Sequence, residues 1–164
     1  MKLRFSYLIG LVVLLGGCGT SRDEVRQIMQ DELSKSVAPR FISSGKTIGP
    51  YSPAIRVGNF LFLSGQIALD PETGNMNSEN IEVETRQVLK NIGRLLHTEG
   101  YDSSNVISAT VYLCDMNNFA KMNTVYGSYF PEGKYPVRTT VGVADLPKQA
   151  NIEITVIAYK APQP

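Results

Sequence analysis

The sequence is poor in histidine and cysteine, the two residues that most often supply a catalytic base, a nucleophile or a metal ligand. Its 164 residues include one histidine, His97, and two cysteines, Cys18 and Cys114. A serine or cysteine nucleophile therefore lacks a histidine base, and no cysteine–histidine cluster supports a zinc site. His97 follows basic residues at helical spacing, which indicates a solvated helix surface. No metal and no cofactor are expected.

Charge excess and phosphate-binding loops are also absent. The 16 Lys and Arg nearly balance the 15 Asp and Glu, without a basic run, so nucleic acid is not an expected partner. The glycines of Gly16-Gly17-Cys18-Gly19 lie beside an apolar N-terminal segment, and Ser64-Gly65-Gln66 is too short for a phosphate loop. The apolar run over residues 7–15 is shorter than the roughly 20 residues of a spanning helix.

The N-terminus instead has the organisation of an export signal. A basic start, a short apolar run and small residues lead into Leu15-Gly16-Gly17-Cys18, which resembles a bacterial lipoprotein box. We expect residues 1–17 to be a lipoprotein signal peptide and Cys18 to carry the lipid that anchors the protein. Gly19 favours the outer membrane, facing the periplasm. The alternative is a plain signal peptide with an incidental cysteine.

Residues 18–40 differ in composition from the rest of the chain. They are charged and polar, and Pro39 ends the segment. Four apolar residues recur at roughly helical spacing: Val25, Ile28, Met29 and Leu33. We interpret the segment as a tether that either forms a short amphipathic helix or is disordered. The remaining residues, 41–164, are long enough for one domain with its own core. Cys114, at the end of an apolar run, is expected to be a small, partly buried residue.

The domain shows a regular alternation of strand and helix patterns. Strands are predicted over 51–57 and 60–64 around a Gly58-Asn59 turn, over 106–113, and over 136–141 and 151–158; helices are predicted over 79–99, ended by Gly100, and over 117–130. On the second helix, four residues are expected to face inward: Phe119, Met122, Tyr126 and Tyr129. The order predicts an α/β domain of the α+β kind, a mixed sheet with two helices on one face.

The strands carry apolar residues on both faces, although two helices cover only one. The run Phe60-Leu61-Phe62-Leu63 shows this most clearly. A sheet buried on both faces needs a second cover, and the sequence has no further elements to supply it. We therefore expect another copy of the chain to cover this face.

The two predicted closing strands each carry one ionised residue, Arg138 and Glu153. Two interpretations fit the residue types. In the first, the pair lies on a solvated face and contributes little to stability. In the second, Arg138 offers a planar fork to a carboxylate ligand, while Glu153, on the neighbouring strand, acts as acid or base. Because histidine, thiol and metal chemistry are excluded, an anion clamp beside a carboxylate is the best candidate site.

Several blocks in series resemble the Rid/YjgF family of reactive-intermediate (enamine/imine) deaminases. The resemblance covers about residues 41–160 and rests on Gly49-Pro50-Tyr51-Ser52-Pro53-Ala54, Leu63-Ser64-Gly65-Gln66, residues 110–119, Asn123-Thr124-Val125-Tyr126, Pro136-Val137-Arg138-Thr139-Thr140-Val141 and Ile152-Glu153-Ile154. It implies a chorismate-mutase-like fold and a homotrimer with a site in each of three clefts between subunits.

The resemblance also implies hydrolysis of 2-imino acids, such as 2-iminopropanoate and 2-iminobutanoate, to 2-oxo acids and ammonia. It assigns the substrate carboxylate to Arg138 and the acid–base role to Glu153. Further substrate-binding residues are implied at four positions: Tyr51, Gly65, Asn123 and Thr140. Many deaminase-type members carry cysteine where this chain has Thr140. The main alternative is a non-catalytic trimeric lipoprotein that binds small carboxylates or acts as a scaffold; RNA cleavage is disfavoured by the neutral charge and the single histidine.

Overall fold

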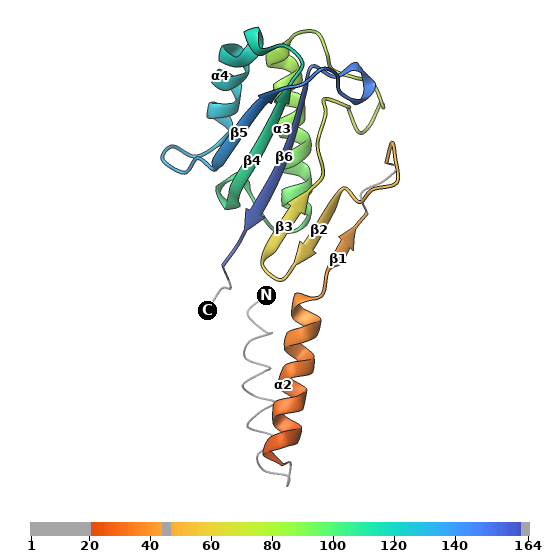
Figure 1. The fold of residues 1–164 in the computed structure, drawn as a ribbon, viewed down its shortest axis with the longest axis vertical. Helices are drawn as coiled ribbons and strands as arrows, with labels where there is room; N and C mark the ends of the chain where they lie inside the picture. Colours follow the sequence, from red (N-terminus) through yellow and green to blue (C-terminus); the bar gives the residue numbers. More distant parts are fainter. Residues whose placement is uncertain (1–20, 44–46, 162–164) are drawn as a thin grey trace.

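The computed structural model describes residues 21–43 and 47–161, which form a six-stranded mixed sheet with helices on one face (Figure 1). Cys18 and the predicted signal segment lie outside the described residues. In chain order the elements are α2 (Arg22–Val37), β1 (Arg40–Ile42), β2 (Ala54–Val57), β3 (Phe60–Leu63), α3 (Ile81–Thr98), β4 (Val106–Leu113), α4 (Phe119–Tyr129), β5 (Val137–Gly142) and β6 (Ile152–Tyr159).

The strands lie in the order β1-β2-β3-β6-β4-β5. β4 and β5 are parallel, with α4 as the crossover that a parallel pair requires, and the other described pairs are antiparallel. α3 and α4 lie on the same face of the sheet (Figure 1). The predicted α+β mixed sheet with two helices on one face is confirmed.

One prediction about the sheet is wrong: β5 and β6 are not neighbours, because β4 lies between them. The physical reason is burial. Every second residue of β6 is an apolar side chain at most 2% exposed, which requires a central position: Ile152, Ile154, Val156 and Ala158. β5 alternates between exposed and half-buried residues and lies at the edge.

Local sequence signals set the turns and helix ends. Gly58 has a φ of +56° in the two-residue turn between β2 and β3, where a side chain would be strained. The Asn80 side chain accepts a hydrogen bond from the Val83 amide at the start of α3. Gly100, with a φ of +77°, follows its end. The helix predicted over 79–99 is therefore present with slightly tighter bounds.

The core lies between the sheet and the two helices. α3 contributes a continuous buried stripe, and β4 and β6 contribute every second residue. Its fully buried members include Val88, Ile92, Leu96, Val111, Leu113, Met122, Ile152 and Ile154. At about 1.5–3 kcal/mol for each large apolar side chain removed from water, this layer is the main stabilising contribution to the fold.

Two local features were not predicted. β1, of three residues, pairs with β2 at the sheet edge, and its exposed Phe41 gives no alternating pattern. The inward orientation expected for Phe119 is wrong, since this side chain is 37% exposed at the start of α4. Met122 and Tyr126 are buried as predicted, and Tyr129 packs against the core.

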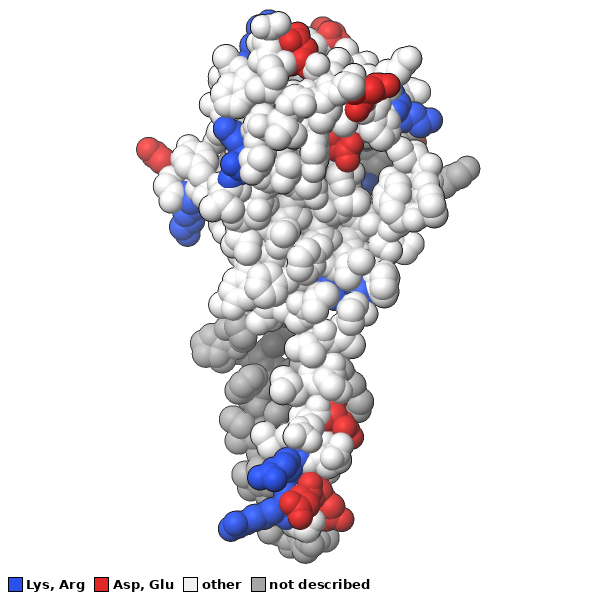
Figure 2. Space-filling view, in the orientation of Figure 1, with Lys and Arg blue, Asp and Glu red and all other residues white. Residues whose placement is uncertain are grey.

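The face of the sheet opposite α3 and α4 carries exposed aromatic residues. Phe60 and Phe62 are each 41% exposed, and the Tyr159 ring lies 4.9 Å from that of Phe60. Figure 2 shows that charged side chains gather at the rim of this face and along α2, whereas its broad middle carries few. Such a surface is suited to burial against another protein surface. Its cover by a second copy stays a prediction.

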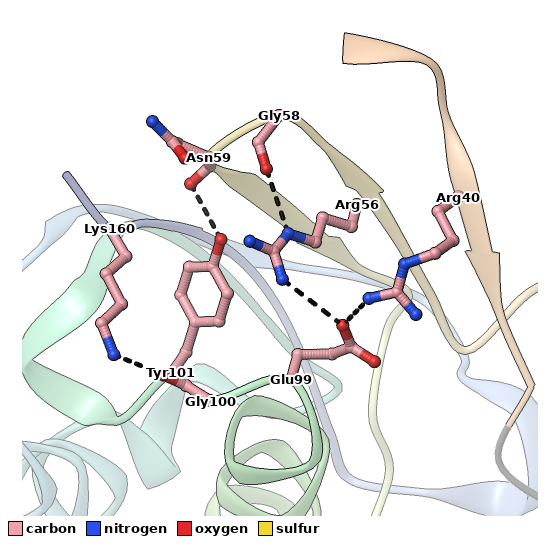
Figure 3. Close-up of polar contacts among 8 residues, drawn as sticks. All are labelled: Arg40, Arg56, Gly58, Asn59, Glu99, Gly100, Tyr101 and Lys160. Atoms are coloured by element: carbon pink, nitrogen blue, oxygen red, sulfur yellow. Dashed lines mark hydrogen bonds and ion pairs between the residues drawn. The ribbon is translucent and has the colours of Figure 1, made fainter. Parts of the chain in front are cut away.

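A polar cluster fastens the β1–β2 hairpin to the end of α3 (Figure 3). Glu99, whose side chain is 7% exposed, accepts a hydrogen bond from Arg40 and lies 3.9 Å from Arg56. The Arg56 guanidinium also lies over the ring of Tyr101, 5.6 Å from its centroid, and the Tyr101 hydroxyl donates to the Asn59 carbonyl at 3.0 Å. Glu99 therefore links two strands to the helix.

Replacing Glu99 by alanine is expected to loosen β1. Because both arginines keep access to water, the expected loss is about 1 kcal/mol in the free energy of unfolding, together with faster amide hydrogen exchange in β1. Urea denaturation and hydrogen exchange measure the two effects. Glu132→Ala, which removes an exposed glutamate elsewhere, is the control. Equal exchange in both variants would contradict this role of Glu99.

α2 precedes the sheet and extends away from it (Figure 1). A capping box starts it, in which the Ser21 hydroxyl accepts from the Glu24 amide and the Glu24 carboxylate accepts from the Ser21 amide. Of the two states left open for this segment, the structure contains the helix, with Met29 and Leu33 exposed. None of the described helices has the length and apolar character needed to cross a bilayer.

Candidate active site

A cleft of about 180 Å³ lies where β3 ends beside the first residues of β6. Three of its lining residues, Tyr51, Gly65 and Glu153, are residues that the resemblance assigns to the site. The described residues that line it are Ile48, Tyr51, Ser64, Gly65, Ile67, Pro147 and Glu153. The structure therefore brings Tyr51 and Gly65, which flank the β2–β3 hairpin, together with Glu153 of β6.

Backbone pairing places Gly65 directly against Glu153. The Gln66 amide donates to the Ile154 carbonyl at 2.9 Å, and the Ile154 amide donates to the Gln66 carbonyl at 3.0 Å. A Cβ atom built on Gly65 would lie 1.6 Å from the Glu153 Oε1 atom. The absence of a side chain at Gly65 is thus what lets the Glu153 carboxylate occupy its position in the cleft.

Gly65→Ala is expected to displace this carboxylate and not the backbone, since the atoms in conflict belong to the end of a flexible side chain. If Glu153 is catalytic, the variant should lose about 10-fold to 100-fold in kcat with a small change in melting temperature, because misplacement by about 1 Å is that costly. Steady-state kinetics and thermal unfolding measure both quantities. Gly127→Ala is the matched control, because a Cβ atom built on this α4 glycine meets nothing within 4 Å. Full activity of Gly65→Ala would contradict the contact's importance.

Glu153 is half-buried, and this burial raises the pKa of its carboxyl group above the ordinary value. The start of its strand is fixed by Glu84 of α3, which is fully buried. The Glu84 carboxylate accepts from the Asn151 amide at 2.7 Å and from the Asn151 side chain at 2.9 Å. A raised pKa on a rigid strand suits a group that accepts and returns a proton during a reaction.

Arg138 belongs to a second group of predicted site residues. Its guanidinium carbon lies 4.6 Å from the ring centroid of Tyr126 and 5.7 Å from that of Phe119, both on α4. Among the described residues no carboxylate forms an ion pair with it. The Thr140 hydroxyl, two residues along β5, is buried without a hydrogen-bond partner. Asn123 is exposed on α4, at helical spacing from both rings.

The Arg138 and Glu153 groups do not meet within one chain. β5 pairs Arg138 with Ala109, whereas β6 pairs Glu153 with Tyr112, so with strands about 4.8 Å apart and a rise of about 3.3 Å the two Cα atoms are roughly 14 Å apart. Their side chains also lie on opposite faces, because Ala109 faces the core and Tyr112 the open side. The proposed pairing on neighbouring strands, solvated or catalytic, is therefore wrong for a single chain.

Two parts of this arrangement were not predicted from the sequence. The stacking of Arg138 on two rings follows from aromatic residues seven apart on α4, a spacing that places both on one helix face. Pro147 reaches the cleft rim through a turn in which Lys148 and Gln149 have φ values of 59° and 57°, which nothing in their residue types indicates. His97 is exposed as predicted.

Comparison with known proteins identifies the family of this chain. Residues 41–160 match the family model described as Endoribonuclease L-PSP. The chain is 56% identical over 115 residues to a RutC family protein of Pyrococcus horikoshii, covering 70% of this chain and 90% of the relative. It is 41% identical over 130 residues to the 2-iminobutanoate/2-iminopropanoate deaminase of Homo sapiens, covering 77% and 94%.

A solved structure gives the same result for the fold. The crystal structure of YyfA from Yersinia pestis, described as a protein of unknown function of the conserved Rid protein family, superposes with a TM-score of 0.72 at 40% identity. The match covers 75% of this chain and all of YyfA. The order of the sheet, the two helices on one face and the matched residues lead to one conclusion: the chain belongs to the Rid/YjgF/RutC family.

Proposed function

We propose that this protein hydrolyses 2-imino acids and their enamine tautomers, such as 2-iminopropanoate and 2-iminobutanoate, to 2-oxo acids and ammonia. The observation that carries the proposal is the guanidinium of Arg138, which lies against two aromatic rings of α4 and has no ion-pair partner in the described chain. A fixed, unpaired guanidinium is suited to a substrate carboxylate. The similarity to a named 2-iminobutanoate/2-iminopropanoate deaminase supports the choice of substrate class.

The chemistry requires one activated water and one proton for the leaving group. Arg138 holds the carboxylate, and Glu153 as a base takes a proton from water while the water oxygen bonds to the imine carbon. Return of this proton to the nitrogen, which receives the electron pair of the C=N double bond, gives a carbinolamine. Glu153 then takes the hydroxyl proton of the carbinolamine and passes it to the amino nitrogen, so the C–N bond breaks as the C=O bond forms, releasing ammonia and the 2-oxo acid. The Gly65 backbone and the Thr140 hydroxyl hydrogen-bond the substrate or water, Asn123 orients the site, and Tyr51 forms a wall.

The site requires two chains, because Arg138 and Glu153 are too far apart in one. We propose that the open sheet face packs against other copies to form a homotrimer, bringing the Arg138 group of one protomer to the Glu153 cleft of the next. The exposed aromatic residues on that face, Phe60 and Phe62, support burial between copies. The number three comes from the family resemblance.

An assay in which the imine is generated enzymatically in the reaction mixture tests the proposed function. An amino acid oxidase generates 2-iminobutanoate, and semicarbazide captures the imine that has not been hydrolysed. The wild-type protein is expected to suppress semicarbazone formation and to accelerate release of 2-oxobutanoate. A rate no higher than buffer, with retained binding of 2-oxobutanoate, would instead support a non-catalytic carboxylate-binding protein.

We further propose that Cys18 carries a lipid that anchors the protein in the cell envelope, on the outer membrane facing the periplasm. The support is the sequence over residues 7–18 alone, and the matched family region begins only at residue 41. In bacteria fed a labelled fatty acid, the wild-type chain is expected to be labelled and to sediment with membranes, whereas Cys18→Ser is not. Equal labelling of Cys18→Ser and wild type would contradict the proposal; Cys114→Ser is the control.

A further inference from the structure

We infer that Tyr126 is a further ligand-binding residue of the Arg138 group: its ring positions the guanidinium, and its hydroxyl donates a hydrogen bond to the carboxylate that Arg138 holds. This inference rests on the proposed function, because it assumes that Arg138 binds a small carboxylate. From the sequence, Tyr126 is expected only to be an inward-facing residue of its helix.

The position of the ring supports the first half of the inference. Tyr126 is 3% exposed, and its ring centroid lies 4.6 Å from the Arg138 guanidinium carbon and 4.8 Å from the Phe130 ring. Packing against Phe130 fixes the ring, and the fixed ring offers one face to the cation. Phe119, at 5.7 Å, adds a second contact. Arg138 is thereby held in one orientation before any ligand arrives.

The hydroxyl supports the second half. The Tyr126 oxygen is buried and has no hydrogen-bond partner in the described chain. Burying a hydroxyl without a partner is costly, and a phenylalanine would pack the same ring without that cost. The hydroxyl belongs to the ring that lies against the guanidinium, which places it in the neighbourhood of a group that Arg138 binds.

The chemistry of the hydroxyl matches a carboxylate. Burial raises the pKa of Tyr126 to about 12, although the charge of Arg138 opposes the rise, so the group keeps its proton at neutral pH and acts as a donor. The Thr140 hydroxyl is the second buried oxygen without a partner on the Arg138 side. Thr140 lies two residues from Arg138 on the same face of β5, so the two hydroxyls without partners and the unpaired guanidinium supply donors for an anion bound on this side of the strand.

Binding of 2-oxobutanoate, the product of the proposed reaction, to the full chain tests the inference by calorimetry. Tyr126→Phe keeps the ring and removes the hydroxyl. We expect its Kd to rise about 10-fold, the usual effect of losing a hydrogen bond to a charged group. Its melting temperature without ligand should equal or exceed that of wild type, because an unpaired buried hydroxyl is gone.

Tyr129→Phe is the matched control. Tyr129 lies on the same helix and packs edge-on against the same Phe130 ring at 5.1 Å, but it does not stack on Arg138. Removing its hydroxyl is therefore expected to leave the Kd for 2-oxobutanoate within twofold of wild type. For Tyr126→Phe we expect weaker binding of 2-oxobutanoate together with an equal or higher melting temperature. This combination distinguishes a ligand contact from a structural role, because losing a structural contact would lower the melting temperature.

The outcomes are distinct. A wild-type Kd in Tyr126→Phe, or a lower melting temperature with unchanged binding, would overturn the inference and leave the proposed function standing. Absence of 2-oxobutanoate binding by the wild-type chain would also overturn it. Binding by wild type without imine hydrolysis, together with a 10-fold weaker Tyr126→Phe, would overturn the proposed function and support the inference.

Discussion

Glu153→Gln is expected to lose on the order of 100-fold to 10,000-fold in kcat for 2-iminobutanoate, with a small change in KM. The amide has nearly the shape of the carboxylate but cannot accept a proton from water, and general acid–base catalysis contributes about that range of rate. Substrate binding through Arg138 is unaffected. Steady-state rates of 2-oxobutanoate release measure the change. A variant with more than half of the wild-type kcat would exclude Glu153 as the base.

The same variant has a stability signature. Burial raises the pKa of Glu153 in the folded state above its value in the unfolded chain, so the folded state binds more protons between these two pKa values. The free energy of unfolding therefore falls as the pH rises through these two pKa values. The destabilisation caused by the buried, ionised carboxylate persists at neutral pH. Glu153→Gln should unfold at an equal or higher temperature than wild type at pH 7, and this difference should shrink below about pH 4. Marked destabilisation at pH 7 would contradict the raised pKa.

Arg138→Ala is expected to lower kcat/KM by on the order of 100-fold to 10,000-fold, mainly through KM. Two hydrogen bonds from a guanidinium to a carboxylate are each worth about 1.5–3 kcal/mol, and alanine removes both. Arg138→Lys keeps the charge and loses the planar fork, so it should recover only part of the loss.

Exposed Arg94 of α3 supplies the control for this change, since Arg94→Ala removes the same charge far from the cleft. It should leave kcat/KM within twofold of wild type. Equal losses in Arg94→Ala and Arg138→Ala would indicate a general effect of charge on substrate approach, and would remove the assigned role of Arg138.

Much of the fold could be predicted because its signals are local. The Gly58-Asn59 turn, the helix ended by Gly100 and the alternating strand of β4 each follow from a few adjacent residues. The candidate residues could be named from the resemblance, since it depends on blocks of sequence. The scarcity of histidine and cysteine then excluded nucleophilic and metal-dependent mechanisms, which left an anion-binding arginine beside a carboxylate.

The arrangement of those residues could not be predicted, because it depends on pairing between distant segments. β6 enters the sheet between β3 and β4, so β4 separates Arg138 from Glu153, and the pairing register places the two side chains on opposite faces. The contact between Gly65 and Glu153 depends on the same insertion. Two strands that follow one another in the sequence predict a hairpin. This prediction gives neither the separation of Arg138 from Glu153 nor the contact between Gly65 and Glu153.

Mixing two inactive variants tests most directly the central claim that a 2-imino acid deaminase site is built from two chains. Arg138→Ala and Glu153→Gln subunits, unfolded together and refolded, should form some interfaces with an intact Arg138 on one side and an intact Glu153 on the other. Random assortment of equal amounts makes about a quarter of the interfaces intact, so about a quarter of wild-type imine hydrolysis should return. Activity no higher than that of the separate variants, in a mixture shown to exchange subunits, would contradict the account.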